Sequence, residues 1–214
     1  MLTAAVMLAG SPVIREDWAA FAPGTTFTEG AANGEWYDQF NGYGSAAVVA
    51  DARFGRALQL VPKASTGSGE THAALVTSLG SLTDFSLQLS VQTLRQLRTP
   101  VPLPSETAWV LWRYIDASHF YYFALKPNGW ELGKEDPAYP GAQHFLASGP
   151  SPVGAIGTWN DLAVEQRSAT MTVSVNGKHV VTFTDVQEPY LIGSVGLYCE
   201  DAIARFGPIR ADAL

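Results

Sequence analysis

Two glutamates on one expected strand are the first candidates for chemistry in this sequence. Glu131 and Glu135 flank Gly133 at alternating positions, so a strand would turn both carboxyls to the same face of its sheet. A carboxyl pair can cleave a glycosidic bond, as nucleophile and acid/base, when the two groups lie about 5–5.5 Å apart. Positions i and i+4 of a strand are about 13 Å apart at Cα, so the long side chains would have to lean together. The plainer interpretation, two solvated glutamates beside a hairpin, is the one that these residues alone favour.

A second candidate set consists of Arg113, His119 and Tyr121. In an eliminative cleavage of a uronic-acid polymer, such an arginine neutralises the uronate carboxylate. The histidine then takes the C5 proton, and the tyrosine protonates the leaving oxygen. The alternative is structural: His119 occupies a turn, and Arg113 pairs with Glu135 across the sheet. The residues favour this structural alternative.

Three expected strands, 107–115, 119–126 and 130–134, must position these side chains. Turn residues separate them at Asp116-Ala117-Ser118 and at Pro127-Asn128-Gly129. Pairing of Ile115 with His119 and of Lys126 with Trp130 would fix the register. One face then carries Val110, Trp112, Tyr114, Phe120, Tyr122, Ala124 and Leu132. The other face carries Trp109, Leu111, Arg113, His119, Tyr121, Phe123, Glu131 and Glu135, and such a mixture of rings and charges is typical of a sugar-binding groove.

The stretch Asn33–Tyr43 also concentrates aromatic and polar side chains, among them Trp36, Tyr37 and Asp38. Rings stack on the apolar faces of sugars and amides bond vicinal hydroxyls, so this stretch is a candidate sugar-binding loop. An equally compatible interpretation is that Trp36 and Phe40 plug one end of a sandwich. His72 follows a Gly/Ser-rich loop and is a further candidate for the rim of the groove, although a lone histidine is more often an ordinary surface residue.

Composition bounds the class of protein. The 214 residues are 47% hydrophobic and 15% charged, which is ample apolar material for the core of one domain. The net charge of −7 argues against nucleic acid and against an anionic membrane surface as partners. The single Cys199 excludes an internal disulfide and a cysteine-rich zinc site. No motif requires a cofactor, because no phosphate loop, dinucleotide fingerprint or nucleophile elbow occurs.

The first fourteen residues, 1–14, are apolar. They are either the remnant of a secretory signal or the first strand of the fold, and they lack a basic n-region. They are also too short to span a bilayer, so we expect no membrane insertion. We expect a secreted or cell-surface protein, while a cytoplasmic location stays open.

Alternation with period two runs through almost every apolar segment and predicts an all-β fold. Strands are expected at 13–18, 46–50, 57–61, 73–78, 84–94, 107–115, 119–126, 130–134, 159–166, 169–175, 178–184, 193–199 and 203–206. Val175-Asn176-Gly177-Lys178 is a strong two-residue hairpin signal. Short strands with Gly/Pro punctuation indicate a two-sheet antiparallel β-sandwich of the jelly-roll type, with residues 1–214 as one domain.

Several short motifs carry a family resemblance. They are Glu16-Asp17-Trp18, Trp112-Arg113-Tyr114, Gly157-Thr158-Trp159-Asn160, Val173–Lys178, Gly193–Tyr198 and Ala204-Arg205-Phe206. Together they resemble the concanavalin A-like jelly-roll superfamily, and within it the laminin-G-like and 3-keto-disaccharide hydrolase-like domains. The resemblance implies the fold, which hosts lectins, hydrolases and lyases alike.

The resemblance is incomplete at the sites. Lichenase-type hydrolases of the superfamily carry Glu-x-Asp-x-Glu, whereas Gly133 occupies the middle position here. The lyase motifs are not matched. Related domains often bind a structural calcium through a Phe-Asp-Asp strand, which reads Phe206-Gly207-Pro208 in this chain. A calcium site at Asp17 and neighbouring carbonyls is therefore weakened, but it stays an expectation.

These observations predict a carbohydrate-active protein that binds a poly- or oligosaccharide on one sheet face. They lean toward glycan cleavage, hydrolytic through Glu131 and Glu135 or, less favoured, eliminative through Arg113, His119 and Tyr121. The alternative is a non-catalytic laminin-G-like module that binds a glycan or a protein.

Overall fold

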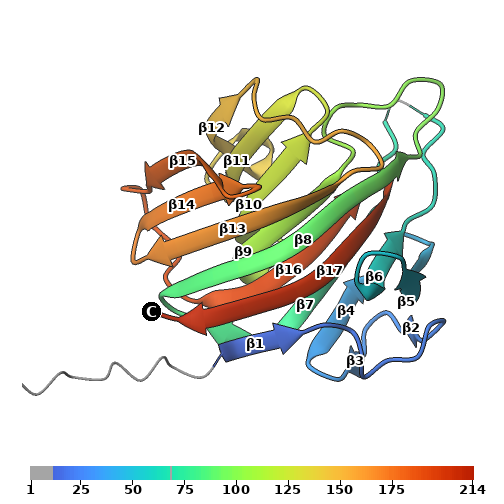
Figure 1. The fold of residues 1–214 in the computed structure, drawn as a ribbon. Helices are drawn as coiled ribbons and strands as arrows, with labels where there is room; N and C mark the ends of the chain where they lie inside the picture. The colour runs from blue at the N-terminus through green and yellow to red at the C-terminus, as the bar shows by residue number, and fades with distance from the viewer. Residues whose placement is uncertain (1–11, 68) are drawn as a thin grey trace, which may run out of the picture.

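Alternating side chains give most strands an apolar face and a polar face, and two antiparallel sheets bury the apolar faces against each other. The computed structural model describes residues 12–67 and 69–214. In Figure 1, β13, β8 and β17 lie side by side in the nearer layer, with β9, β16 and β7 behind them. This is the expected β-sandwich.

The first sheet has the strand order β15-β14-β13-β8-β17-β6-β5-β2, and β1 also pairs with β17. Its strands are β1 (Pro12–Glu16), β2 (Thr26–Phe27), β5 (Ser45–Asp51), β6 (Gly55–Val61), β8 (Phe85–Gln96), β13 (Trp159–Arg167), β14 (Thr170–Val175), β15 (Lys178–Thr184) and β17 (Ala202–Ala213).

The second sheet has the order β12-β11-β10-β9-β16-β7-β4-β3. Its strands are β3 (Ala32–Asn33), β4 (Trp36–Phe40), β7 (Ala73–Leu82), β9 (Ala108–Asp116), β10 (His119–Lys126), β11 (Gly129–Glu135), β12 (Gln143–Gly149) and β16 (Gly193–Glu200). A short 3₁₀ turn, η1 (Pro140–Ala142), connects β11 to β12.

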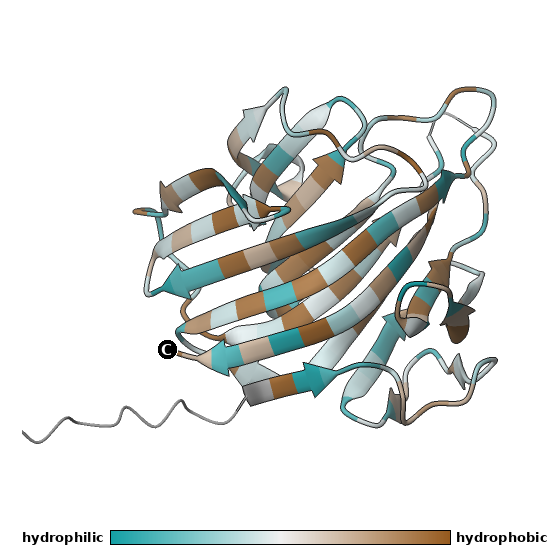
Figure 2. Cartoon of the chain, in the orientation of Figure 1, coloured by the Kyte–Doolittle hydropathy of each residue, from teal (hydrophilic) through white to brown (hydrophobic). Residues whose placement is uncertain are grey.

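Hydropathy follows the layers. Apolar and polar residues alternate along β8, β13 and β17 in Figure 2. On β14, Met171, Val173 and Val175 are buried, while the hydroxyls of Thr170 and Thr172 bond threonines of β15 at 2.9 and 3.0 Å on the wet face. Burial of one face holds the strand in this register, because a slip of one residue would expose the apolar set.

The predicted register of the three central strands is wrong at both turns. His119 pairs with Asp116 instead of Ile115, and Lys126 pairs with Gly129 instead of Trp130. A bulge between His119 and Tyr121, next to the left-handed backbone of Arg113 (φ 51°), shifts the pairing of β9 and β10. Tyr121 therefore lies opposite Trp112, inside the sandwich, and Tyr122 lies opposite Leu111 on the outer face.

The apolar segment 1–14 is described only at its end. Pro12–Glu16 forms β1, whereas residues 1–11 lie outside the described residues. No helix in the described part of the chain is long and apolar enough to cross a membrane. Export of the protein stays a prediction.

Candidate functional site

The outer face of the second sheet carries a cluster of aromatic side chains. Trp109 of β9 stacks on Tyr122 of β10 with ring centroids 4.6 Å apart, and Tyr198 of β16 meets Trp109 edge-on at 5.4 Å. Phe40 and Phe120 pack against the same cluster and are only partly buried. Trp109 and Tyr122 are buried, whereas Phe40, Phe120 and Tyr198 are partly exposed, so the cluster presents apolar rings to solvent as a candidate ligand surface.

A hollow of ≈ 230 Å³ opens on this face. It is lined by Phe40, Leu75, Trp109, Leu111, Ala117, Phe120, Glu135, Gly141, Gln143, Tyr198 and Glu200. Trp109, Leu111 and Leu75 are buried and form its floor, and the partly exposed rings of Phe40, Phe120 and Tyr198 form its walls. The polar members are two carboxyls and one amide, which suit the hydroxyls of a sugar.

Glu135 and Glu200 face this hollow from different strands, β11 and β16. Burial raises the pKa of Glu135 to about 7, and the charge of Glu200 adds to the rise. Burial also raises the pKa of Glu200, but the hydroxyl of Tyr198 donates a hydrogen bond to Glu200 Oε1 at 2.7 Å and favours the charged form. The two carboxyls therefore differ in how readily they hold a proton.

Family membership follows from comparison with known proteins. The family model of the 3-keto-alpha-glucoside-1,2-lyase-like domain matches residues 19–211. The chain belongs to this family. No curated protein matches the sequence.

Solved structures whose sequences differ strongly from this chain confirm its jelly-roll fold. The carbohydrate-binding module CBM66 from Bacillus subtilis aligns with a TM-score of 0.60 and 15% identity, over 84% of this chain and 96% of the module. A family 16 endo-glucanase from Bacteroides ovatus aligns with a TM-score of 0.57 and 9% identity, over 93% of this chain and 99% of its own. The laminarinase catalytic domain from Thermotoga maritima gives 0.57 and 10%, over 96% and 99%. The fold is thus that of carbohydrate-binding and glycoside-hydrolase-like jelly rolls.

Glu131 is the other carboxylate of the pair predicted from the sequence. It lies on the same outer face, but both of its oxygens already have partners. Its Oε1 accepts a hydrogen bond from Tyr122 at 2.7 Å, and its Oε2 lies 2.7 Å from the ammonium of Lys126. Gln143 in turn donates to the hydroxyl of Tyr122 at 2.8 Å. Glu131 therefore anchors Tyr122, which supports the floor residue Trp109.

Gly133 is the reason why Tyr122 can reach Glu131. A Cβ added at Gly133 would lie 2.2 Å from both Cζ and the hydroxyl oxygen of Tyr122. We expect Gly133→Ala to displace the ring and lower the free energy of unfolding by about 1–3 kcal/mol. Gly80→Ala, on β7 with open space around its Cα, is the matched control and should change it by less than about 0.5 kcal/mol. Urea unfolding of both variants measures the difference, and equal values for the two would show that the ring moves at little cost.

Arg113 and Tyr121 lie in the interior, away from the outer face. The guanidinium of Arg113 is fully buried, donates to the backbone carbonyls of Leu82 (2.6 Å) and Leu191, and lies 3.6 Å from Asp84. The expected pair between Arg113 and Glu135 does not form. The hydroxyl of Tyr121 donates to Asp185 at 2.6 Å. Neither side chain can contact a ligand in the hollow.

His119 and His72 are each held by carboxylates outside the hollow. His119 Nδ1 lies 2.8 Å from Asp116 Oδ1 in the turn between β9 and β10. His72 is buried, with Nδ1 3.2 Å from Ser65 Oγ and Nε2 3.3 Å from Glu70. Neither histidine lines the hollow that Glu135 and Glu200 face.

The predicted loop 33–43 is mostly strand, and alternation on β4 divides its residues. Trp36 is fully buried in the core, with its indole N–H donating to Glu16, as one interpretation predicted. Phe40, the other ring of that interpretation, lies on the outer face instead, because a bulge between Asp38 and Phe40 interrupts the alternation of β4. Asp38 also points inward and is fully buried. Tyr37 faces outward and lines a neighbouring hollow of ≈ 450 Å³ together with Tyr114.

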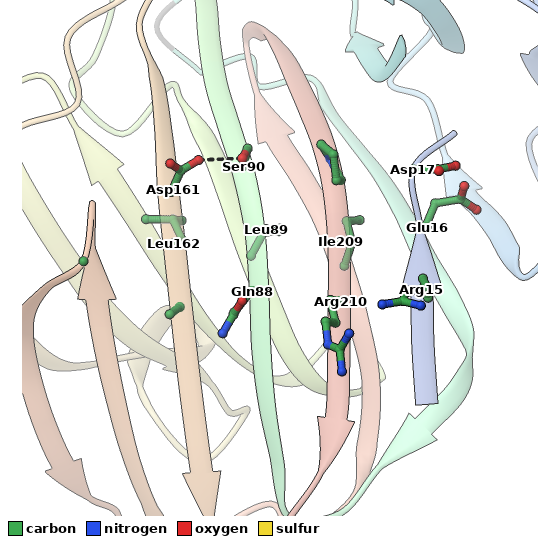
Figure 3. A pocket seen from close by; sticks show the side chains of 13 residues that line it. Arg15, Glu16, Asp17, Gln88, Leu89, Ser90, Asp161, Leu162, Ile209 and Arg210 are labelled. Atoms are coloured by element: carbon green, nitrogen blue, oxygen red, sulfur yellow. Dashed lines mark hydrogen bonds between the residues drawn. The ribbon is translucent and has the colours of Figure 1, made fainter. Parts of the chain in front are cut away.

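A larger hollow of ≈ 600 Å³ lies on the outer face of the other sheet. Figure 3 shows its side chains on β1, β17, β8 and β13, with Ser90 hydrogen-bonded to Asp161. Its lining residues include arginines, carboxylates and aliphatic side chains but no aromatic ring. It therefore offers a sugar no surface for stacking.

Asp17 lines this larger hollow and accepts a hydrogen bond from the backbone N–H of Ala19 at 2.9 Å. Both oxygens of the adjacent Glu16 accept N–H donors, from Trp18 and from Trp36. Within the described residues, no group of three or more His, Cys, Asp or Glu side chains is arranged to hold a metal ion. A calcium site at Asp17 and neighbouring carbonyls stays a prediction.

Sequence reasoning missed Glu200, Tyr198, Phe40, Phe120 and Gln143 as members of the hollow. Tyr198 and Glu200 stand two positions apart on β16, so they share a face, and this alternation was a usable signal. The others depend on which strands neighbour one another, which no local pattern in the sequence specifies.

Proposed function

We propose that the hollow on the outer face of the second sheet binds a neutral poly- or oligosaccharide. The observation that carries the proposal is the meeting of three partly exposed rings with two carboxyls and an amide in one hollow. Rings bury the apolar face of a pyranose, and carboxylate and amide oxygens accept hydrogen bonds from its hydroxyls. Solved structures of this fold that bind or process carbohydrates support the proposal.

Charge favours a neutral glycan over a uronic-acid polymer. The residues that line the hollow include two acidic side chains and no basic one. Arg113, the cation that would neutralise a uronate, is buried in the interior. An anionic polymer would be repelled by this face and by the net charge of −7.

The alternative is a non-catalytic laminin-G-like module. A glycan array, followed by tryptophan fluorescence titration with neutral and acidic polysaccharides, distinguishes glycan binding from a module of this kind that binds a protein. Binding of neutral glycans supports the proposal, whereas silence across the panel favours a protein-binding module.

The wall residue Phe120 provides a direct test. We expect Phe120→Ala to weaken glycan binding about tenfold or more, because loss of a stacking ring removes at least about 1.4 kcal/mol of contact. Phe54→Ala is the matched control, since Phe54 is also partly buried but packs against Trp159 on the opposite sheet. Dissociation constants from fluorescence titration give the comparison. Equal weakening by both variants would place the binding surface elsewhere.

A further inference from the structure

We propose that Glu135 and Glu200 are the acid and base of a glycoside hydrolase, with Glu135 as general acid and Glu200 as general base. The inference rests on the proposed function, because it needs a glycan in the hollow. It replaces the sequence-based pair Glu131/Glu135 with a pair drawn from two strands that are far apart in the chain.

Geometry supports this pair over the earlier one. Glu135 ends β11 and Glu200 ends β16, and both line the hollow whose walls are Phe40, Phe120 and Tyr198. Glu131 is absent from that lining, and its two oxygens already serve Tyr122 and Lys126. The oxygens of Glu131 are thus turned toward Tyr122 and Lys126 and not toward the hollow.

Hydrogen bonding assigns the two roles. The hydroxyl of Tyr198 donates to Glu200 at 2.7 Å, and a donor stabilises the ionised form of a carboxyl. No donor among the described residues bonds the carboxyl of Glu135, which sits between the aromatic walls. Different environments for two nearby carboxyls are the pattern that separates an acid from a base.

Proton affinity agrees with these roles. Burial and the charge of Glu200 raise the pKa of Glu135 to about 7, so this carboxyl can carry the proton of a general acid near neutral pH. The other titratable groups that interact with Glu135 are Tyr198 and Tyr122, and burial raises the pKa of both far above neutrality. The tyrosines therefore stay protonated across the working range. Glu200 also interacts with Asp201 and Glu106, whose charges raise its pKa, and with Arg98, whose charge lowers it.

The reaction uses water as the second substrate. Glu135 gives its proton to the glycosidic oxygen as the bond from that oxygen to C1 breaks, and the leaving sugar departs as an alcohol. Glu200 takes a proton from water, whose oxygen bonds to C1. Transfer of one proton from Glu200 to Glu135 through solvent restores the starting state.

Purified protein should be incubated with neutral polysaccharides, such as mixed-linkage β-glucan and laminarin, while new reducing ends are measured. We expect Glu135→Gln and Glu200→Gln each to lower the rate at least about a hundredfold, with the dissociation constant for the glycan changed less than about threefold. Glu165→Gln, an exposed glutamate on β13 of the other sheet, should keep the wild-type rate. Circular dichroism and melting temperatures identify any variant that fails to fold.

The pH profile adds a readout that a structural role would not move. The wild-type rate should fall above about pH 7, as Glu135 loses its proton. In Glu200→Gln this fall should begin at lower pH, because the neighbouring charge no longer raises the proton affinity of Glu135.

The outcomes separate the two proposals. Glycan binding without new reducing ends overturns the acid–base pair and leaves the proposed function standing, whereas absence of binding across the panel overturns the proposed function itself. Cleavage that survives in Glu200→Gln but is lost in Glu131→Gln would return the role of second carboxyl to Glu131.

Discussion

Replacement of Lys134 by methionine is expected to lower the free energy of unfolding by about 3–5 kcal/mol. Lys134 is fully buried, and its ammonium donates to the carbonyls of Gln187 and Glu188 at 2.7 and 2.9 Å. It also lies 3.1 Å from the buried carboxylate of Asp185. Methionine fills a similar volume but leaves two carbonyls and the carboxylates of Asp185 and Asp136 without their cation. A buried charge that loses its counter-ion is far more costly than an exposed one.

Urea unfolding at pH 7 measures this cost. Lys63→Met is the control, because Lys63 is largely exposed and lies 3.9 Å from Glu70, a geometry that contributes less than about 1 kcal/mol. The double variant Lys134→Met/Asp185→Asn should recover part of the loss, since it removes both charges of the pair. A loss for Lys134→Met as small as that for Lys63→Met would show that water replaces the cation at little cost.

The strands were the most predictable feature of this chain, because alternation is a local signal. The expected strands 119–126 and 178–184 coincide with β10 and β15. The strands that sequence reasoning missed, β2, β3, β4 and β12, are short or only partly buried. Apolar and polar residue types do not alternate clearly in such segments, and their pairing is decided by strands that are distant in sequence.

The register of the central strands was less predictable, and the candidate site depended on it. One bulge beside Arg113 turned Tyr121 inward and Tyr122 outward. Glu131 and Glu135 kept the same face as Trp109, because the pairing of β10 with β11 is also shifted by one residue and the two shifts cancel. A bulge requires a residue with an unusual backbone angle, and arginine gives no advance sign of adopting φ 51°.

Arg113 and Lys134 are buried, although charged residues are normally exposed, because each donates hydrogen bonds to backbone carbonyls in the interior. Arg113 bonds the carbonyls of Leu82 and Leu191, and Lys134 bonds those of Gln187 and Glu188. Both cations thereby hold the segment that leads into β16, which carries Tyr198 and Glu200. The two buried cations therefore help to fix the position of β16 and of its wall residue Tyr198. Composition alone does not reveal this role.

Replacement of Asp38 by asparagine is expected to raise the free energy of unfolding by about 3 kcal/mol at pH 7, opposite in sign to the effect of Lys134→Met. Asp38 is fully buried, and neither carboxylate oxygen has a hydrogen-bond partner in the described residues. Burial, aided by the charge of Glu29, raises the pKa of Asp38 from 3.8 to about 6. Because each pKa unit corresponds to about 1.4 kcal/mol, the ionised side chain costs the folded state about 3 kcal/mol, and asparagine avoids this cost.

The dependence on pH tests the physical cause. The folded state holds the proton of Asp38 more tightly than the unfolded chain does, so this group contributes its full stability below pH 3.8. That contribution is lost as the pH rises through the folded pKa of about 6. The advantage of Asp38→Asn over wild type should therefore vanish at low pH, grow between these two values and level off above them. Asp17→Asn, at an exposed aspartate, is the control for the general effect of removing one negative charge. An Asp38→Asn variant less stable than wild type at pH 7 would mean that the ionised carboxylate is stabilised by a partner, and the expected sign would be wrong.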